Sequence, residues 1–218
     1  YRFSPPAAVR RARKRQLEPG VFSGSEAEPL YGDTYLPRKF KVAVTVPGDN
    51  SVDLLTQDIG LVAFTDPSGD LRGCNVYVGG GMGRTHNKEE TFARIADPLG
   101  YVDAADVFDL LQAIVALQRD HGDRRIRRHA RMKYLLEDRG IAWFRNELKS
   151  NYFSSPLKGL RNEAKPKLLD YLGWHRQKAG LWFVGLPLLC GRLKGEMKQG
   201  LRAIVDTYQL EIRLTANQ

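Results

Sequence analysis

The run of residues 39–46 alternates between two kinds of side chain, and this alternation constrains the fold more than any other stretch. Its apolar members Phe40, Val42, Val44 and Val46 fall on one side of an extended chain. A period of two predicts a β-strand that buries that side. Lys39 and Lys41 share the opposite side, about 6.5–7 Å apart along the strand. From the strand alone, two interpretations are open: an edge strand with its lysines in solvent, or a site where both ammonium groups face an anion.

The composition indicates a globular chain with an anionic partner. The 218 residues are 42% hydrophobic, which is enough to build a core. There are 34 Lys and Arg against 25 Asp and Glu, a net charge of +9, so we expect nucleic acid, a membrane surface, an acidic protein or an acidic cofactor as partner. Two cysteines, Cys74 and Cys190, exclude a four-cysteine metal site and a disulfide framework, and favour a reduced compartment. No apolar run of about 18 residues is present, so we predict no membrane span.

Turn and helix signals divide the chain into a tail, two folded parts and a linker. Residues 1–30 carry a basic run without apolar periodicity and are expected to form a disordered basic tail or linker. The predicted boundaries place the first domain at 31–153, the linker at 154–167 and the second domain at 168–218. Together these parts predict an α+β fold.

Each part has its own predicted elements. In the first domain, strands over 59–65 and 71–78 form a hairpin, and helices are expected over 104–119, with Asp103 as N-cap, and through Trp143 and Leu148. In the second domain, strands are expected over 172–174, 181–189 and 210–214, with a helix over 196–208. Strands on both sides of one helix indicate an incomplete ferredoxin-like unit.

Two further stretches are candidates for binding. A glycine run, 79–83, leaves a predicted strand and lets backbone N–H groups approach a flat or anionic ligand, although its spacing fits neither a P-loop nor a dinucleotide motif. A helix is expected to begin at residues 87–90, because acids stand in its first turn.

The second candidate stretch, 123–133, is the most basic in the chain. If it is helical, Arg124, Arg128 and Arg131 share one face, which favours either an anion site or a solvated charge run. His129 in this stretch is either a metal or haem ligand or an ordinary surface histidine.

Several segments, in the same order along the chain, resemble the sirohaem-dependent sulfite and nitrite reductases. They are residues 31–41, 79–88, 118–124, 128–134 and 214–218. The run 46–51 and the intact sequence Arg84-Thr85-His86-Asn87 are more similar to the ferredoxin-dependent sulfite reductases than to the nitrite enzymes. The resemblance implies a sirohaem/[4Fe-4S] reductase domain, with a mixed sheet and helices, followed by a ferredoxin-like half-domain.

The implied reaction is the six-electron reduction of sulfite to sulfide with electrons from ferredoxin, and reduction of nitrite is the alternative. The resemblance implies that Lys39 and Lys41 neutralise the bound oxyanion and orient or donate protons. It implies that sirohaem, a polycarboxylate, is held by basic and glycine-rich positions. These are Arg38, Gly79, Gly80, Gly81, Arg84, His86, Asn87, Arg124, Arg128, Arg131, Lys133, Asn217 and Gln218.

The chain also departs from the family pattern. The family's four cluster cysteines lie beyond the position where this chain ends, Cys74 and Cys190 match neither pair, and no metal ligand is assigned here. Because the chain begins with Tyr1 and stops on a strand without a cap, we expect a central portion of the enzyme: a fragment, a subunit that needs a partner chain, or an inactive remnant.

Two expectations complete the sequence-based hypotheses. The chain is expected in the cytoplasm, or in the plastid stroma of a photosynthetic eukaryote. The hypothesis from another class is a nucleic-acid-binding module that uses the basic residues 10–15 and 124–133.

Overall fold

A computed structural model describes residues 30–31, 35–168, 171–177 and 180–215. The chain divides into two compact units, described separately: unit 1 comprises residues 1–47 and 53–165, and unit 2 comprises 48–52 and 166–218. Residues 1–29 of the basic tail lie outside the described residues, as do Asn217 and Gln218.

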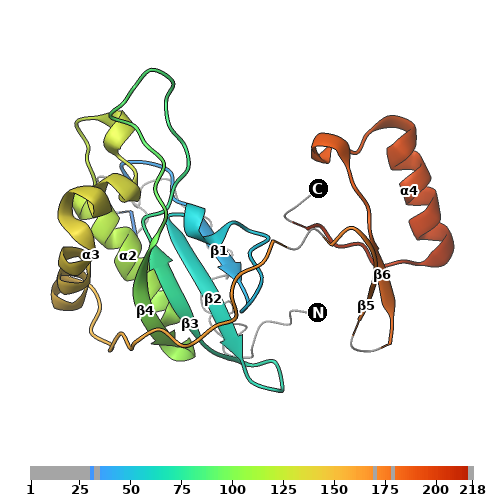
Figure 1. Cartoon of the computed structure of the whole chain (residues 1–218), viewed down its shortest axis with the longest axis horizontal. Helices are drawn as coiled ribbons and strands as arrows, with labels where there is room; N and C mark the ends of the chain where they lie inside the picture. Colours follow the sequence, from blue (N-terminus) through green and yellow to red (C-terminus); the bar gives the residue numbers. More distant parts are fainter. Residues whose placement is uncertain (1–29, 32–34, 169–170, 178–179, 216–218) are drawn as a thin grey trace, which may run out of the picture. The chain divides into compact units, whose positions relative to one another are not determined.

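Unit 1 is built on a four-stranded mixed sheet (Figure 1). Its strands are β1 (Val42–Thr45), β2 (Ile59–Thr65), β3 (Leu71–Val78) and β4 (Asp97–Asp103), in that spatial order. β1 pairs with β2 in parallel, and the other neighbours are antiparallel. The predicted hairpin is confirmed residue for residue.

β4 was not predicted, and the helix expected to begin at residues 87–90 is wrong. Residues 82–93 form an irregular loop, and the chain then enters β4. The acids at Glu89 and Glu90 resemble a helix start, and Phe92, Ile95 and Leu99 follow at helical spacing, but Pro98 cannot continue a helix. β4 starts at Asp97-Pro98, an unusual start for a strand, and its central residues are buried.

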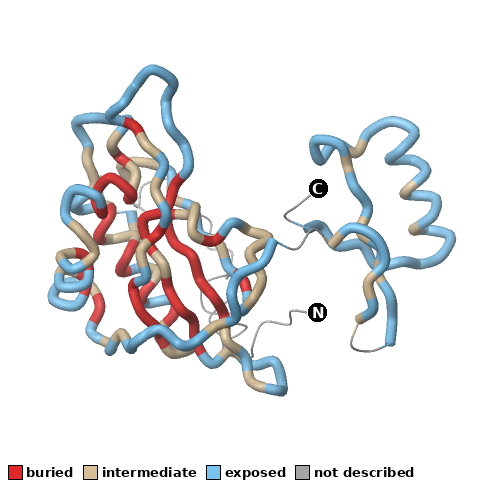
Figure 2. Tube along the Cα trace, viewed as in Figure 1, coloured by how far each residue is buried: buried red, intermediate tan, exposed pale blue. Residues whose placement is uncertain are grey.

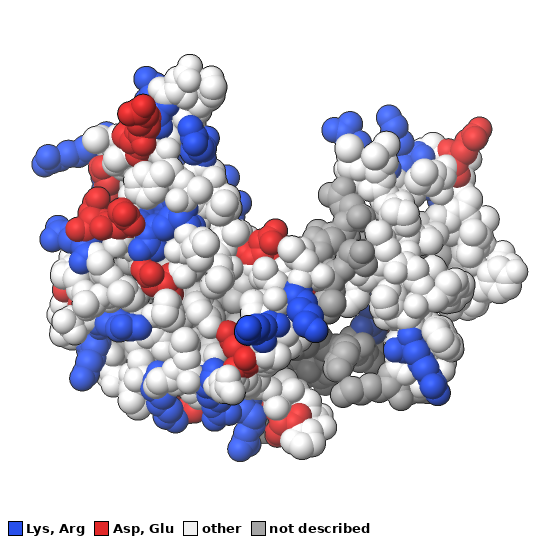
Figure 3. Space-filling model, viewed as in Figure 1, with Lys and Arg blue, Asp and Glu red and all other residues white. Residues whose placement is uncertain are grey.

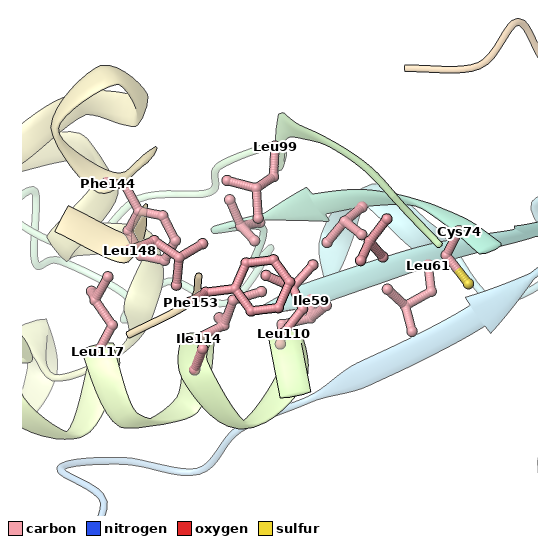
Figure 4. Close-up of a cluster of buried hydrophobic side chains, with 14 of the residues drawn as sticks. Ile59, Leu61, Cys74, Leu99, Leu110, Ile114, Leu117, Phe144, Leu148 and Phe153 are labelled. Atoms are coloured by element: carbon pink, nitrogen blue, oxygen red, sulfur yellow. The ribbon is translucent and has the colours of Figure 1, made fainter. Parts of the chain in front are cut away.

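Two helices cover one face of the sheet: α2 (Val107–His121) and α3 (Met132–Asn151). The core lies between them and the sheet, where Ile59 and Leu61 of β2 meet Ile114 and Leu117 of α2 and Phe144 of α3 (Figure 4). Both helices were predicted. Asp103 precedes a short 3₁₀ turn, η2 (Ala104–Asp106), and its side chain makes no capping hydrogen bond. The predicted N-cap role of this residue is therefore wrong.

The valine face of β1 lies on the predicted side of the sheet but is not buried. Val42 and Val44 pair in register with Ile59 and Leu61 of the core, yet about half of each valine surface is exposed. β1 is one of the two edge strands, and the helices pack over the other three strands. On the other side of the strand, Thr45 is buried. The period of two was correct within β1, but the strand begins at Val42, so Lys39 and Lys41 precede it, and the inference of burial was wrong.

The opposite face of the sheet carries the segment that was predicted as a linker. Lys158 pairs with Tyr101 of β4 through both backbone hydrogen bonds, each 2.9 Å. The buried Asn75 side chain donates to the Arg161 carbonyl at 2.8 Å and accepts from the Arg161 amide at 2.9 Å. Tyr77 donates to Glu163 at 2.5 Å. Residues 157–163, here called the strap, are thus fastened to β3 and β4.

Unit 2 contains a short hairpin and one long helix. The elements are β5 (Gly173–Arg176), β6 (Trp182–Gly185), the 3₁₀ turn η4 (Leu189–Gly191) and α4 (Gly195–Tyr208). The predicted strand at 210–214 is absent, since those residues pair with no described strand. No described residue of unit 2 is buried, as Figure 2 shows, because two strands and one helix are too few to enclose a core.

Among the helices that the structure describes, none is both long enough and apolar enough for a membrane crossing.

Candidate functional site

One buried residue, Asp58, connects the predicted strand 39–46 (here called the lysine strand), the glycine run 79–83 and the basic stretch 123–133 (here called the basic segment). Asp58 directly precedes β2, and none of its surface is exposed. Its Oδ2 accepts hydrogen bonds from the Lys41 backbone N–H at 2.9 Å and from Arg131 Nη2 at 2.8 Å. Its carbonyl accepts from the Gly79 N–H at 2.9 Å. Asp58 therefore contacts all three segments that the sequence singled out.

The Asp58–Arg131 pair leaves one buried acceptor and one buried donor without a hydrogen bond. Asp58 Oδ1 and Arg131 Nε are both buried, and neither has a hydrogen-bond partner in the described part of the chain. Burial raises the pKa of the Asp58 carboxyl, and the hydrogen bond and charge of Arg131 oppose that rise. Sequence reasoning missed Asp58, whose only signal was an acid placed immediately before an apolar strand.

The glycine run approaches protein atoms very closely. A Cβ on Gly80 would lie 2.2 Å from the Leu55 carbonyl oxygen, and a Cβ on Gly81 would lie 2.8 Å from Arg131 Nη1. Gly79 has φ +82°, which favours glycine. The run was expected to bring backbone close to a ligand. The described contacts show that it first needs glycine to pack against unit 1 itself.

Lys133 holds the loop that follows the glycine run. Its ammonium is buried and donates to the carbonyls of Gly81 at 3.2 Å, Gly83 at 2.7 Å and Phe92. It also lies 4.8 Å from the centre of the Tyr134 ring, a cation–π contact. Burial lowers the pKa of Lys133, and the nearby Arg131 charge adds to this. In this structure the lysine binds backbone carbonyls and closes the loop.

The remaining loop positions are exposed. Arg84, His86 and Asn87 lie on the loop that joins β3 to β4 and rises above the sheet in Figure 1. Thr91 stabilises this loop, since its Oγ1 accepts from the Thr85 N–H and donates to the Lys88 carbonyl, both at 2.8 Å. Figure 3 shows basic and acidic side chains together at this end of unit 1.

Most of the basic segment is not helical, so the condition under which its arginines would share one face is not met. Only Arg127–His129 forms a 3₁₀ turn (η3), and Asp123 Oδ1 accepts the Arg125 and Ile126 N–H groups at 2.7 and 3.0 Å. This carboxylate fixes a turn at the start of the segment, so Arg124, Arg128 and Arg131 share no helical face.

The three arginines bind different partners. Arg124 donates to the Tyr35 and Arg119 carbonyls at 2.5 and 2.8 Å. Arg128 lies 3.4 Å from Glu90, and Arg131 is paired with Asp58. His129 stacks on Tyr134 with 4.5 Å between ring centres, and its Nε2 lies 2.8 Å from the Glu90 carbonyl. His129 thus links the basic segment to the loop.

Lys39 and Lys41 are among the described cations that remain available to a ligand. Lys39 and Lys41 are exposed, and Arg38 beside them is half-buried. Among the described residues, no carboxylate forms a salt bridge with Lys39, Lys41 or Arg84. These side chains can therefore neutralise a bound anion without first breaking an ion pair.

The residues fit a polycarboxylate macrocycle and do not fit an iron–sulfur cluster. For sirohaem, Lys39, Lys41 and Arg84 are exposed and form no salt bridge with a described residue, and Arg131, paired with Asp58, keeps an Nε–H that has no described partner. For [4Fe-4S], four thiolates are needed. Cys74 is buried in the core of unit 1, and the exposed Cys190 belongs to unit 2. The described residues contain no group of three or more His, Cys, Asp or Glu that could hold a metal.

Comparisons with known proteins agree with the resemblance seen in the motifs. The relative from Synechococcus elongatus is named sulfite reductase (ferredoxin). It is 56% identical over 218 residues, which cover 98% of this chain and 34% of that protein. The sulfite reductase (NADPH) hemoprotein beta-component of Myxococcus xanthus is 43% identical, over 90% of this chain and 35% of that protein. The chain thus spans about a third of the length of these relatives.

Structure and family models give the same result. The solved structure of the Mycobacterium tuberculosis NirA protein matches 82% of this chain and 29% of that protein, with a TM-score of 0.59 and 29% identity. A model described as the nitrite and sulphite reductase 4Fe-4S domain matches residues 15–157. A second, described as the nitrite/sulfite reductase ferredoxin-like half domain, matches 175–218. The chain therefore belongs to the nitrite and sulphite reductase family.

Proposed function

We propose that this chain is the sirohaem-binding and anion-binding portion of a sulfite reductase that takes electrons from ferredoxin and reduces sulfite to sulfide. The observation that carries the proposal is the convergence at Asp58 of the lysine strand, the glycine run and Arg131. The 56% identical relative is named as a ferredoxin enzyme, which favours ferredoxin over NADPH as the electron source. The relatives above that are named by their activity are sulfite reductases, so nitrite is not favoured as substrate.

When sirohaem is bound, it would supply the iron that takes the substrate and would pass on the electrons that ferredoxin provides. This chain's own residues bind and orient. Lys39 and Lys41 have no carboxylate partner among the described residues, so their positive charge is available to a sulfite oxyanion. An ammonium can also donate a proton to a leaving oxygen as an S–O bond breaks.

The four cluster cysteines of the family pattern belong to other parts of the proposed enzyme. Its separate chains or domains are therefore partners that this portion needs. The cytoplasm or the plastid stroma is part of the proposal, and two free cysteines suit such a reduced compartment. Membership of a reductase family argues against the nucleic-acid hypothesis.

The test is a chimera in which this chain replaces the matching third of the Synechococcus elongatus enzyme. With reduced ferredoxin as donor, we expect sulfite turnover above nitrite turnover. Lys39→Ala and Lys41→Ala should each lower sulfite turnover at least tenfold while sirohaem content, read by absorbance, stays within twofold. Lys149→Ala, which removes an exposed lysine on α3, is the matched control. Unchanged turnover in both strand variants, or preferential reduction of nitrite, would contradict the proposal.

A further inference from the structure

Asp58, which was not among the candidate residues, contacts three separate segments of unit 1. Asp58 is fully buried and lies at the junction between η1 (Leu54–Thr56) and β2, where the backbone is fixed on both sides. Immediately before it, the Gln57 carbonyl accepts the Gly80 N–H at 3.0 Å, and after it, the Ile59 N–H donates to the Lys41 carbonyl at 3.0 Å. Because the backbone on both sides of Asp58 is fixed, its carboxylate can fix the positions of the groups that bind to it.

Lys41 is attached to this junction through its backbone and not through its ammonium. Its N–H donates to Asp58 Oδ2, and its C=O accepts from Ile59. The ladder between β1 and β2 starts only at Val42, so the Asp58 side chain extends the attachment one residue beyond the strand. This fixes where the Lys41 side chain leaves the backbone.

Arg131 is attached to the same oxygen from the other side. Its Nη2 donates to Asp58 Oδ2 at 2.8 Å and lies 3.4 Å from the Gly80 carbonyl. Without the carboxylate, a guanidinium with little exposed surface would lose its only charge partner among the described residues. Stranding one member of a buried ion pair is strongly destabilising, so the guanidinium would move.

We propose that Asp58 is a positioning residue for the anion site, holding the Lys41 backbone and the Arg131 guanidinium on one carboxylate oxygen. The proposal rests on the function proposed above. Asp58 touches neither substrate nor macrocycle in this role. It sets the spacing between a cation meant for the oxyanion and a cation meant for the macrocycle, and small displacements of such groups are costly for rate.

The first test measures the attachment itself and needs neither sirohaem nor sulfite. In the 218-residue chain, amide hydrogen exchange at Lys41 is followed in Asp58→Ala and Asp58→Asn. We expect exchange at least tenfold faster in Asp58→Ala, which has no acceptor. Asp58→Asn keeps one carbonyl oxygen and should stay within threefold of the parent. Exchange within twofold of the parent in Asp58→Ala, or equal acceleration in both variants, would overturn the proposal.

The second test uses the chimeric enzyme. In Asp58→Ala we expect sirohaem content to fall at least threefold, and kcat/KM for sulfite per retained sirohaem to fall at least tenfold, with Asp58→Asn recovering part of both. The matched control is Asp120→Ala, which removes the carboxylate of the Arg119–Asp120 pair and should stay within twofold. Equal losses in the control would overturn the proposal. If the parent chimera reduces no sulfite, the proposed function fails, while the exchange test still decides the role of Asp58.

A variant that does not fold also gives an answer. If Asp58→Ala is insoluble, the double variant Asp58→Ala/Arg131→Met removes the stranded guanidinium as well. Fast exchange at Lys41 in a folded double variant supports the positioning role. A folded double variant with a protected Lys41 amide, or one that still does not fold, overturns it.

Discussion

The buried ammonium of Lys133 allows a quantitative prediction of how much it stabilises the loop at residues 82–93, which follows the glycine run. Lys133→Met keeps the length and the apolar part of the side chain but removes donors to the carbonyls of Gly81, Gly83 and Phe92. A hydrogen bond from a charged donor contributes about 1.5 kcal/mol at the low end, so the three together contribute about 4.5 kcal/mol. The lowered pKa of Lys133 shows that burying its charge has a cost, which methionine avoids. Offsetting about 1–2 kcal/mol for that relief leaves a loss of about 3 kcal/mol.

The assay is urea unfolding of the 218-residue chain, followed by far-ultraviolet circular dichroism. With an m-value of about 2 kcal/mol per molar, the midpoint of the unit 1 transition should fall by about 1.5 M. Trypsin should also cut the loop faster, because Arg84 and Lys88 lie on it. Lys149→Met changes an exposed lysine to the same residue and should alter the free energy of unfolding by less than about 0.5 kcal/mol. A loss below about 1 kcal/mol in Lys133→Met, or an equal loss in the control, would refute the assignment of this lysine as the residue that closes the loop.

Three other features of unit 1 give direct tests. Gly81→Ala should lower the free energy of unfolding by about 1–2 kcal/mol, because its Cβ would meet a held guanidinium, whereas Gly83→Ala has open space around it and should be neutral within about 0.5 kcal/mol by urea titration. Asn75→Ala should cost about 2–3 kcal/mol and expose the strap to proteolysis, and a strap that is no more cleavable than in the parent would contradict this. Burial raises the pKa of the Cys74 thiol to about 11, so about one molecule in a thousand is thiolate at pH 8. Mass spectrometry after iodoacetamide treatment should find the exposed Cys190 labelled well before Cys74, and the reverse order would contradict the burial of Cys74.

Much of the fold could be predicted because its signals are local. The hairpin of β2 and β3 is bounded by a dense cluster of turn residues, and α2 and α3 carry apolar residues on a helical period. Sequence analysis missed β4 because its strand signal is weak: it begins with Asp97-Pro98 and contains Gly100. Its identity as a strand depends on pairing with β3, which a local pattern does not report.

The prediction that one face of β1 is buried was wrong for a different reason. Alternation at Val42 and Val44 correctly identified two faces, but whether a face is covered depends on how far the helices extend over the sheet. The helical face considered for the basic segment does not form, because a side chain competes for the backbone hydrogen bonds that a helix would need. Asp123 accepts two backbone N–H groups and so holds a turn that residue spacing alone cannot foresee.

Asp58 shows why the resemblance identified the cations and missed the residue that connects them. An aspartate before an apolar strand is ordinarily a solvated turn residue, and nothing in its neighbours distinguishes it. Its importance comes from three segments far apart in sequence, represented by Lys41, Gly79 and Arg131, that meet on one residue. Charged side chains that bind an anion are visible as charge in a sequence. The carboxylate that fixes their positions is negative and lowers the net positive charge of the region. Composition and charge patterns therefore hide the residue on which the geometry of the site depends.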